Sequence, residues 1–187
     1  MIDILKKVYK KIHIIQNIYL KNNFFFKKQS YSMEGEDLII SELSKNINKG
    51  FYVDAGCYHP LHFNNTQLLY EKKWQGINID LSEFSIDLFN FMRPNDININ
   101  AAISNDDREI TFYYQKKLSQ LSTIKKKEAQ IRMQGYIKEK KIKSKKLTTI
   151  LNDSVYNKIK IDFLNIDLEG ADFEALKSLD FETYRPK

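Results

Sequence analysis

The ten residues Phe51-Tyr52-Val53-Asp54-Ala55-Gly56-Cys57-Tyr58-His59-Pro60 indicate the fold class of this 187-residue chain more clearly than any other segment. Their apolar, β-prone start and small-residue end are typical of a buried strand that stops at a ligand rather than at water. Gly56 would let the backbone approach a ligand without a Cβ in the way, and the Asp54 carboxylate could accept hydrogen bonds from amino or hydroxyl groups. An ordinary strand followed by a tight turn would look the same, so this segment needs support from the rest of the chain.

A second short apolar run closed by an acid, Gly76-Ile77-Asn78-Ile79-Asp80, follows after the helix-like segment 65–73. The spacing is that of one βαβ unit, in which parallel strands end at the same edge of a sheet. At the second strand end of a nucleotide-binding α/β fold an acid hydrogen-bonds a ribose diol, and Asp80 is predicted to take that role. Only Gly56 remains of the three-glycine pyrophosphate fingerprint. The pattern therefore favours a ligand that has a ribose and no phosphate, such as S-adenosylmethionine.

More acids follow a later strand. The run from Ile161 to Ile166 is predicted as a fourth strand, with Asp167 and Glu169 directly after it. These two acids belong to the edge that also holds Asp54 and Asp80, where open α/β sheets bind their ligands. Converging carboxylates suit a cationic ligand. Asp167 and Glu169 could instead hold Mg²⁺, or serve only as turn and capping residues.

The other expected elements are a helix over 32–43, a helix over 83–92 capped by Ser82 and ended by Pro94, a third strand with its exit over 97–103, and a strand over 109–114. The strand over 109–114 is expected to pair with the third strand as a hairpin, because the turn-forming residues 105–107 separate the two.

Several motifs occur in a fixed order along the chain: Tyr31-Ser32-Met33-Glu34-Gly35-Glu36-Asp37-Leu38, Gly50 to Gly56, His59-Pro60, Asn64-Asn65-Thr66, Gly76 to Asp80, Asn100-Ala101-Ala102-Ile103-Ser104, and Asp162 to Gly170. This ordered set resembles the FkbM family of S-adenosylmethionine-dependent methyltransferases over about residues 31–187. The resemblance implies an α/β, Rossmann-like class I methyltransferase sheet with its central strands in the order 3-2-1-4. Such sheets normally have seven strands, so residues 29–187 are expected to be a partial methyltransferase domain, truncated before the fifth strand.

The resemblance also assigns roles at the site. It implies that Glu36 lies by the methionine end of the cofactor and that Ala101 and Ala102 leave room for its adenine ring, although small residues also simply permit close packing. Met33 stands where the family commonly has Gln. The full set of expected cofactor-binding residues is Glu36, Asp54, Gly56, Asp80, Ala101, Ala102 and Asp167.

Methyl transfer to an alcohol gains from a general base. His59, just past the glycine turn, is the candidate base, and His62 is the reserve; a structural histidine beside Pro60 is the alternative. Acceptors in the resembling family are usually sugar or polyketide hydroxyls, so a glycan hydroxyl is the expected acceptor.

Charge is distributed unevenly. Residues 1–28 carry +6 and residues 116–146 carry +10 of a net charge of +6, so the rest of the chain is acidic at −10. The segment 116–146 is expected to be either a solvated excursion or a lid whose lysines favour an acidic acceptor. It lacks closely interleaved aromatic residues for base stacking, which argues against the remaining alternative, a basic nucleic-acid-binding protein.

Residues 1–28 are predicted to form a basic amphipathic helix, because Leu5, Val8, Ile12 and Ile15 recur at three- and four-residue steps. The helix could lie on an anionic membrane surface, pack on a partner, or pack on its own domain. Phe24-Phe25-Phe26 would then need burial. No apolar run is long enough for a signal-peptide core or a membrane span.

The length and the composition suit one globular domain, and the single Cys57 excludes an internal disulfide framework and suits a reducing, cytoplasmic compartment. Two other possibilities follow from the expected truncation. The chain could be an inactive cofactor-binding domain, or a second copy or another protein could complete it at the open sheet edge.

Overall fold

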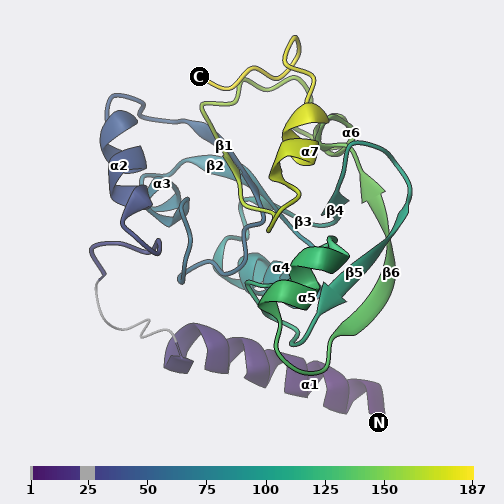
Figure 1. Ribbon diagram of the computed structural model, residues 1–187. Helices are drawn as coiled ribbons and strands as arrows, with labels where there is room; N and C mark the ends of the chain where they lie inside the picture. Colours follow the sequence, from purple (N-terminus) through teal and green to yellow (C-terminus); the bar gives the residue numbers. More distant parts are fainter. Residues whose placement is uncertain (1, 22–27) are drawn as a thin grey trace.

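The computed structural model describes residues 2–21 and 28–187 (Figure 1), so the expected burial of Phe24-Phe25-Phe26 lies outside the described residues. A four-stranded parallel sheet lies at the centre, with the strand order β3-β2-β1-β7. Its strands are β1 (Phe51–Ala55), β2 (Gln75–Asp80), β3 (Ile97–Asn100) and β7 (Phe163–Ile166). Because β7 is the fourth strand of this sheet along the chain, the predicted order 3-2-1-4 is the observed one.

Both faces of this sheet are covered, which explains why β1 reads as a continuous apolar run and is buried throughout. Successive side chains of a strand point to opposite faces. Val53 packs with Ile77 and with Leu151 in one cluster, whereas Tyr52 packs with Trp74 in another on the opposite face. Figure 1 shows α2 (Glu36–Leu43) and α3 (Gln67–Glu71) on one side of the sheet, and α6 (Leu147–Asn152) and α7 (Asp172–Lys177) on the other.

The helix α4 (Glu83–Met92) joins β2 to β3 and has the predicted boundaries. Ser82 Oγ accepts a hydrogen bond from the Ser85 N–H at 3.2 Å, and Pro94 follows shortly after the last helical residue. The helix predicted over 32–43 begins later than expected, at Glu36, because Gly35 takes a left-handed conformation there.

A second, three-stranded sheet has the order β4-β6-β5 and corrects two expectations. The strand β5 (Glu109–Tyr114) pairs antiparallel with β6 (Lys138–Lys145), not with the third strand, while the short β4 (Ala102–Ile103) pairs with the other edge of β6. Residues 116–146 therefore do not form a wholly solvated excursion, since β6 and α5 (Lys126–Arg132) both belong to them.

The amino-terminal segment forms α1 (Ile2–Ile15), followed by a π-helical turn, η1 (Gln16–Lys21). Figure 1 shows α1 along the lower border of the molecule. Ile14 and Ile18 pack against Phe84 and Leu88 of α4, and the His13 ring stacks on Phe84 with ring centroids 4.4 Å apart. Among the described helices, none is both long and apolar enough to cross a membrane.

Candidate functional site

A cavity of about 360 Å³ opens where β1, β2 and β7 end, and we refer to it as the edge cavity. Parallel α/β sheets bind ligands at this carboxyl edge. Its lining residues come from the start of α2, from the loops after β1, β2 and β7, and from the segment 116–146, which we call the insertion: Met33, Glu36, Gly56, Tyr58, Phe63, Asn65, Asp80, Leu81, Ser119, Gln120, Ser122, Arg132, Asp167, Leu168 and Glu169. Four of the seven residues expected to bind a cofactor are in this set, namely Glu36, Gly56, Asp80 and Asp167.

Asp80 is fixed in the wall of the edge cavity by backbone hydrogen bonds. Its Oδ2 accepts from the Tyr58 N–H at 2.8 Å, and its Oδ1 accepts from the Ser82 N–H at 2.7 Å. Each carboxylate oxygen has a second lone pair, so both can still accept from a ligand hydroxyl. Burial raises the pKa of Asp80 to about 6, and the two backbone bonds limit that rise.

The other acids of the cavity wall lie at the end of β7 and at the start of α2. Partial burial, together with repulsion from Asp172 and Asp54, raises the pKa of Asp167. Glu169 forms an ion pair with Arg132 of α5. Glu36 Oε2 accepts from the Glu34 N–H at 2.9 Å, and hydrogen bonds from the backbone lower its pKa.

Gly56 lines the edge cavity, where its contact with a cofactor stays a prediction, and it also has a structural role. A Cβ on this residue would lie 1.9 Å from the backbone oxygen of Asp167, and its φ is +90°. The missing side chain thus makes room for the turn after β7. Gly56 brings the ends of β1 and β7 together and so shapes the cavity.

The backbone around the cavity is unusually contorted. Tyr58, Phe63 and Glu169 all have positive φ values, of 53°, 49° and 50°, and all three line the edge cavity. Such conformations are costly for residues with a Cβ and concentrate where a loop must hold a particular shape for a ligand.

Asp54 lies beneath the edge cavity rather than in its wall. Its carboxylate accepts hydrogen bonds from Thr66 Oγ1 at 2.7 Å, Asn165 Nδ2 at 2.9 Å and Asn64 Nδ2 at 3.3 Å. Burial raises the pKa of Asp54, and the hydrogen bonds from Asn165 and Thr66 oppose that rise. Asp54 therefore ties the loop before α3 to β7, and direct contact with a cofactor stays a prediction that the cavity wall does not support.

No pattern in the sequence indicates the buried arginine that lies beneath the site. Arg93 is 0% exposed, and its guanidinium donates to Asn64 Oδ1 at 2.7 Å, Thr66 Oγ1 at 2.9 Å and Gln67 Oε1 at 2.9 Å. Asn64 and Thr66 are also the residues that bond to Asp54. Through Asn64 and Thr66 the guanidinium therefore fixes the loop before α3, which forms part of the cavity wall.

Neither candidate base, His59 or His62, is among the described residues that line the edge cavity. His59 is buried, and its Nδ1 accepts from the Leu61 N–H at 3.0 Å. Burial lowers the pKa of His59 to about 3, and burial also lowers that of His62. A nitrogen with so low a pKa is a weak base, so the assignment of His59 or the reserve His62 as the general base stays a prediction that this arrangement does not favour.

Ala101 and Ala102 also lie outside the cavity lining. Ala102 is buried in β4, where it pairs with Ser144, and Ala101 packs against the main apolar cluster. Close packing, the alternative weighed for these small residues, accounts for both positions.

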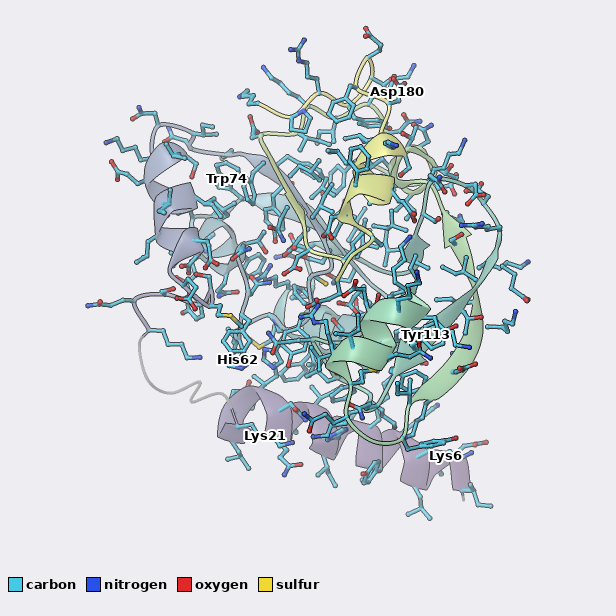
Figure 2. The ribbon with its side chains drawn as sticks, in the orientation of Figure 1. Lys6, Lys21, His62, Trp74, Tyr113 and Asp180 are labelled. Carbon is cyan, nitrogen blue, oxygen red and sulfur yellow. The ribbon has the colours of Figure 1, made fainter. Side chains whose placement is uncertain are left out.

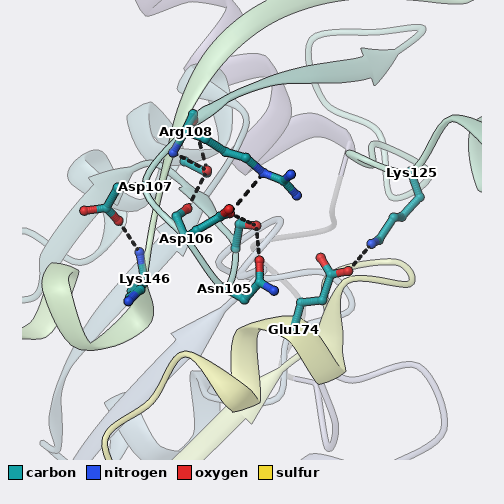
Figure 3. A network of polar contacts seen from close by, with 9 residues as sticks. Asn105, Asp106, Asp107, Arg108, Lys125, Lys146 and Glu174 are labelled. Carbon is teal, nitrogen blue, oxygen red and sulfur yellow. Dashed lines mark hydrogen bonds and ion pairs between the residues drawn. The ribbon is translucent and has the colours of Figure 1, made fainter.

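The insertion covers the edge cavity and is fastened to the turn after β7. Thr123 Oγ1 donates to the Glu169 backbone oxygen at 2.9 Å, and Lys125 forms an ion pair with Glu174 of α7. Figure 3 shows this ion pair beside the contacts that hold the loop before β5, in which Asp107 accepts from the Lys146 N–H at 2.9 Å. Ser119, Gln120 and Ser122 enter the cavity lining as a result of this fastening.

The donor set gives Mg²⁺ no support. Across residues 2–21 and 28–187, no three His, Cys, Asp or Glu side chains are grouped so that they could hold a metal ion. Glu169 is paired with Arg132, which competes with a cation for that carboxylate.

Comparison with known families matches residues 54–187 to the methyltransferase FkbM domain. Neither the curated proteins nor the solved structures give a match. The matched region includes β1 from Asp54 onward, β2, β7 and most of the edge-cavity wall, and it confirms the resemblance found in the sequence. The chain therefore belongs to the methyltransferase FkbM domain family.

Proposed function

We propose that this protein is an S-adenosylmethionine-dependent methyltransferase with a Rossmann-like class I sheet, and that it methylates a hydroxyl group of a sugar or glycan. The observation that carries the proposal is the position of Asp80 in the edge cavity, at the end of β2, with both carboxylate oxygens turned toward backbone donors and still able to accept. An acid at this strand end is the usual partner of a ribose diol.

The cavity wall suits this cofactor in three respects. Its volume of about 360 Å³ lies within the usual range for small-molecule pockets, about 300–1,000 Å³. Asp80 can accept from the two ribose hydroxyls. Glu36 and Asp167 supply negative charge for the ammonium and sulfonium groups of S-adenosylmethionine. A loop that binds phosphate would not supply this charge.

S-adenosylmethionine supplies a methyl group on a positively charged sulfur. In transfer to a hydroxyl the sulfur–carbon bond breaks, a carbon–oxygen bond forms, and the hydroxyl proton must leave. Asp167 lines the cavity, is partly exposed and has a raised pKa. We assign it the role of proton acceptor in preference to His59, which is buried away from the wall.

A sugar hydroxyl as acceptor is supported by the polar side chains that the insertion contributes. Ser119, Gln120 and Ser122, with Asn65 from the loop before α3, offer hydroxyl and amide groups to the cavity. Such groups both donate and accept, as recognition of neighbouring sugar hydroxyls requires.

The direct test is transfer of a labelled methyl group from S-adenosylmethionine to a panel of mono- and oligosaccharide acceptors, including acidic ones. We expect the full chain to label at least one acceptor and to form S-adenosylhomocysteine in equal amount. Tight cofactor binding without transfer to any acceptor would favour the inactive cofactor-binding domain. Absence of cofactor binding would reject the proposal.

Replacing Asp80 by alanine is expected to weaken cofactor binding about ten- to a hundredfold, because hydrogen bonds from the ribose to a charged partner are lost. Isothermal titration calorimetry with S-adenosylhomocysteine measures this change. Asp162→Ala is the matched control: Asp162 also accepts a backbone N–H, that of Phe51 at 3.0 Å, but it lies at the opposite end of the sheet. Equal affinities of the two folded variants would remove the ribose assignment.

Cofactor affinity is expected to decrease as the pH falls through about 6, the pKa to which burial raises Asp80. Above this pKa the ionised carboxylate can accept from both ribose hydroxyls, whereas a proton on one oxygen removes an acceptor at lower pH. One linked proton limits the decrease to about tenfold per pH unit. Calorimetry on both sides of this pKa checks the profile, and Asp80→Ala should retain only the part due to Asp167. A pH-independent affinity in the parent protein would contradict the role of Asp80.

A further inference from the structure

The amino-terminal helix α1 exposes its apolar stripe to solvent. Five aliphatic side chains are between 47% and 66% exposed: Ile4, Leu5, Val8, Ile12 and Ile15. At 3.6 residues per turn these positions share an arc about 100° wide. Such a stripe on a helix of a globular protein normally faces the core. Here the stripe faces solvent instead.

The opposite face of α1 fixes the helix to the domain. Lys10 forms an ion pair with Asp87 at 2.7 Å, the His13 ring stacks on Phe84, and Ile14 packs into the cluster around Leu88. Lys10, His13 and Ile14 all lie across the helix from the exposed stripe. The domain contacts therefore hold the stripe in an outward orientation, along the border of the molecule that Figure 2 marks with Lys6 and Lys21.

The charges around the stripe are almost all positive. Lys7 and Lys11 lie along one edge of the stripe, and Tyr9, 64% exposed, lies near the other. Residues 1–28 contain seven lysines and a single acid, Asp3, which is on the domain side of the helix. An outward aliphatic stripe with a lysine edge and an interfacial aromatic side chain is typical of helices that lie in the plane of a membrane surface.

We propose that α1 is a docking surface for an anionic lipid bilayer. The helix lies parallel to the bilayer, with Leu5, Val8 and Ile12 in the boundary between headgroups and acyl chains. Lys7 and Lys11 reach the lipid phosphates. A second copy of the chain is a poorer occupant, because pairing two such helices through their stripes would bring like charges together, each helix having four lysines and one acid. An anionic lipid surface instead complements that charge.

Point variants test the proposal better than removal of α1, which would uncover Phe84 and Leu88. The test variant is Val8→Asp with Ile12→Asp. The matched control is Leu43→Asp with Val155→Asp, which makes the same changes in charge at two aliphatic residues exposed elsewhere on the domain. A third variant, Lys7→Gln with Lys11→Gln, removes charge without altering the stripe. Equal melting temperatures establish that all of them fold.

Binding of the full chain is measured by co-sedimentation with vesicles of phosphatidylcholine alone and with vesicles containing about one-third phosphatidylserine. We expect binding to the anionic vesicles that weakens with salt and little binding to the neutral ones. The Asp variant of α1 should bind at least about fiftyfold more weakly, and the Gln variant about fivefold more weakly per lysine. The control variant, Leu43→Asp with Val155→Asp, should lose only the small part of the binding that is due to its change in net charge.

Three results would overturn the proposal. The first is that the parent protein ignores anionic vesicles at low salt. The second is that the α1 and control variants lose binding equally. The third is a dimer, detected by light scattering, that dissociates in the Val8→Asp, Ile12→Asp variant, because the stripe would then be an interface between copies. None of these results depends on catalysis, so the test is independent of the proposed methyl transfer.

Discussion

Replacing Arg93 by methionine is expected to lower the free energy of unfolding by about 3–5 kcal/mol, as removal of one buried partner of a charge network does. Methionine keeps an unbranched apolar stem but has none of the donors of arginine. Asn64, Thr66 and Gln67 would each lose a buried hydrogen bond from the guanidinium. The buried carboxyl of Asp54 would also lose the positive charge that favours its ionised form.

Urea denaturation followed by circular dichroism measures this change. The control is Arg108→Met, since Arg108 pairs with Asp106 at 2.9 Å in an ion pair whose two side chains are about half exposed, and such pairs contribute about 0–1 kcal/mol. A loss for Arg93→Met no greater than that for Arg108→Met would show that the buried network does not support the fold.

Replacing Gly56 by alanine is expected to lower the free energy of unfolding by at least about 3 kcal/mol and to abolish cofactor binding. The added Cβ would fall 1.9 Å from the Asp167 backbone oxygen, so the turn after β7 would have to move. Thermal melting and calorimetry with S-adenosylhomocysteine measure the two consequences.

The Gly135→Ala control separates the close contact of the added Cβ from the strain of a positive φ. Gly135 also has a positive φ, of +85°, but nothing lies within 4 Å of the position of its Cβ. It should therefore cost only about 1–2 kcal/mol, the strain of a left-handed conformation for a residue with a Cβ. Similar losses at both positions would mean that the contact between β1 and β7 is not tight.

The central sheet could be predicted from the sequence because its two inner strands, β1 and β2, are buried on both faces and end in a small residue or an acid. Asp54 and Asp80 are alike in this respect, yet only Asp80 lines the edge cavity. The difference is one of position along the strand. Asp54 pairs with Asn78 in the parallel register, so Asp80 points to the same face but lies two residues nearer the carboxyl edge of the sheet. Asp54 lies deeper and accepts from Thr66, in the network of Arg93.

The strand β6 could not be predicted, because Lys138–Lys145 contains one large apolar residue, Ile142, among its lysines. Its pairing with β5 is supported by contacts between neighbouring strands, such as Lys141 with Glu109 at 3.4 Å and the Lys138 ammonium over the Tyr114 ring. Such contacts depend on the partner strand and leave no periodic pattern in the strand itself.

For α1 the limit is of another kind. Periodicity identified the stripe of Leu5, Val8, Ile12 and Ile15, but not whether it contacts the domain. That outcome depended on Ile14 and Ile18, which pack on α4 although they lie outside the stripe. The structure thus gives the helix both a domain contact and a free apolar face.

The pairing of β7 with β1 has a consequence for the order in which the molecule assembles. Asn165 and Asp54, hydrogen-bonded across these strands, are 111 residues apart in the sequence. Pairings of such long range form slowly, because a large part of the chain must be ordered before they can close. Asp167 and Glu169 follow β7, so a partly folded chain that has β1 and β2 but not β7 holds Asp80 without an edge cavity. A ligand of that cavity therefore binds only after β7 has paired with β1, and it stabilises the folded state over such partly folded ones.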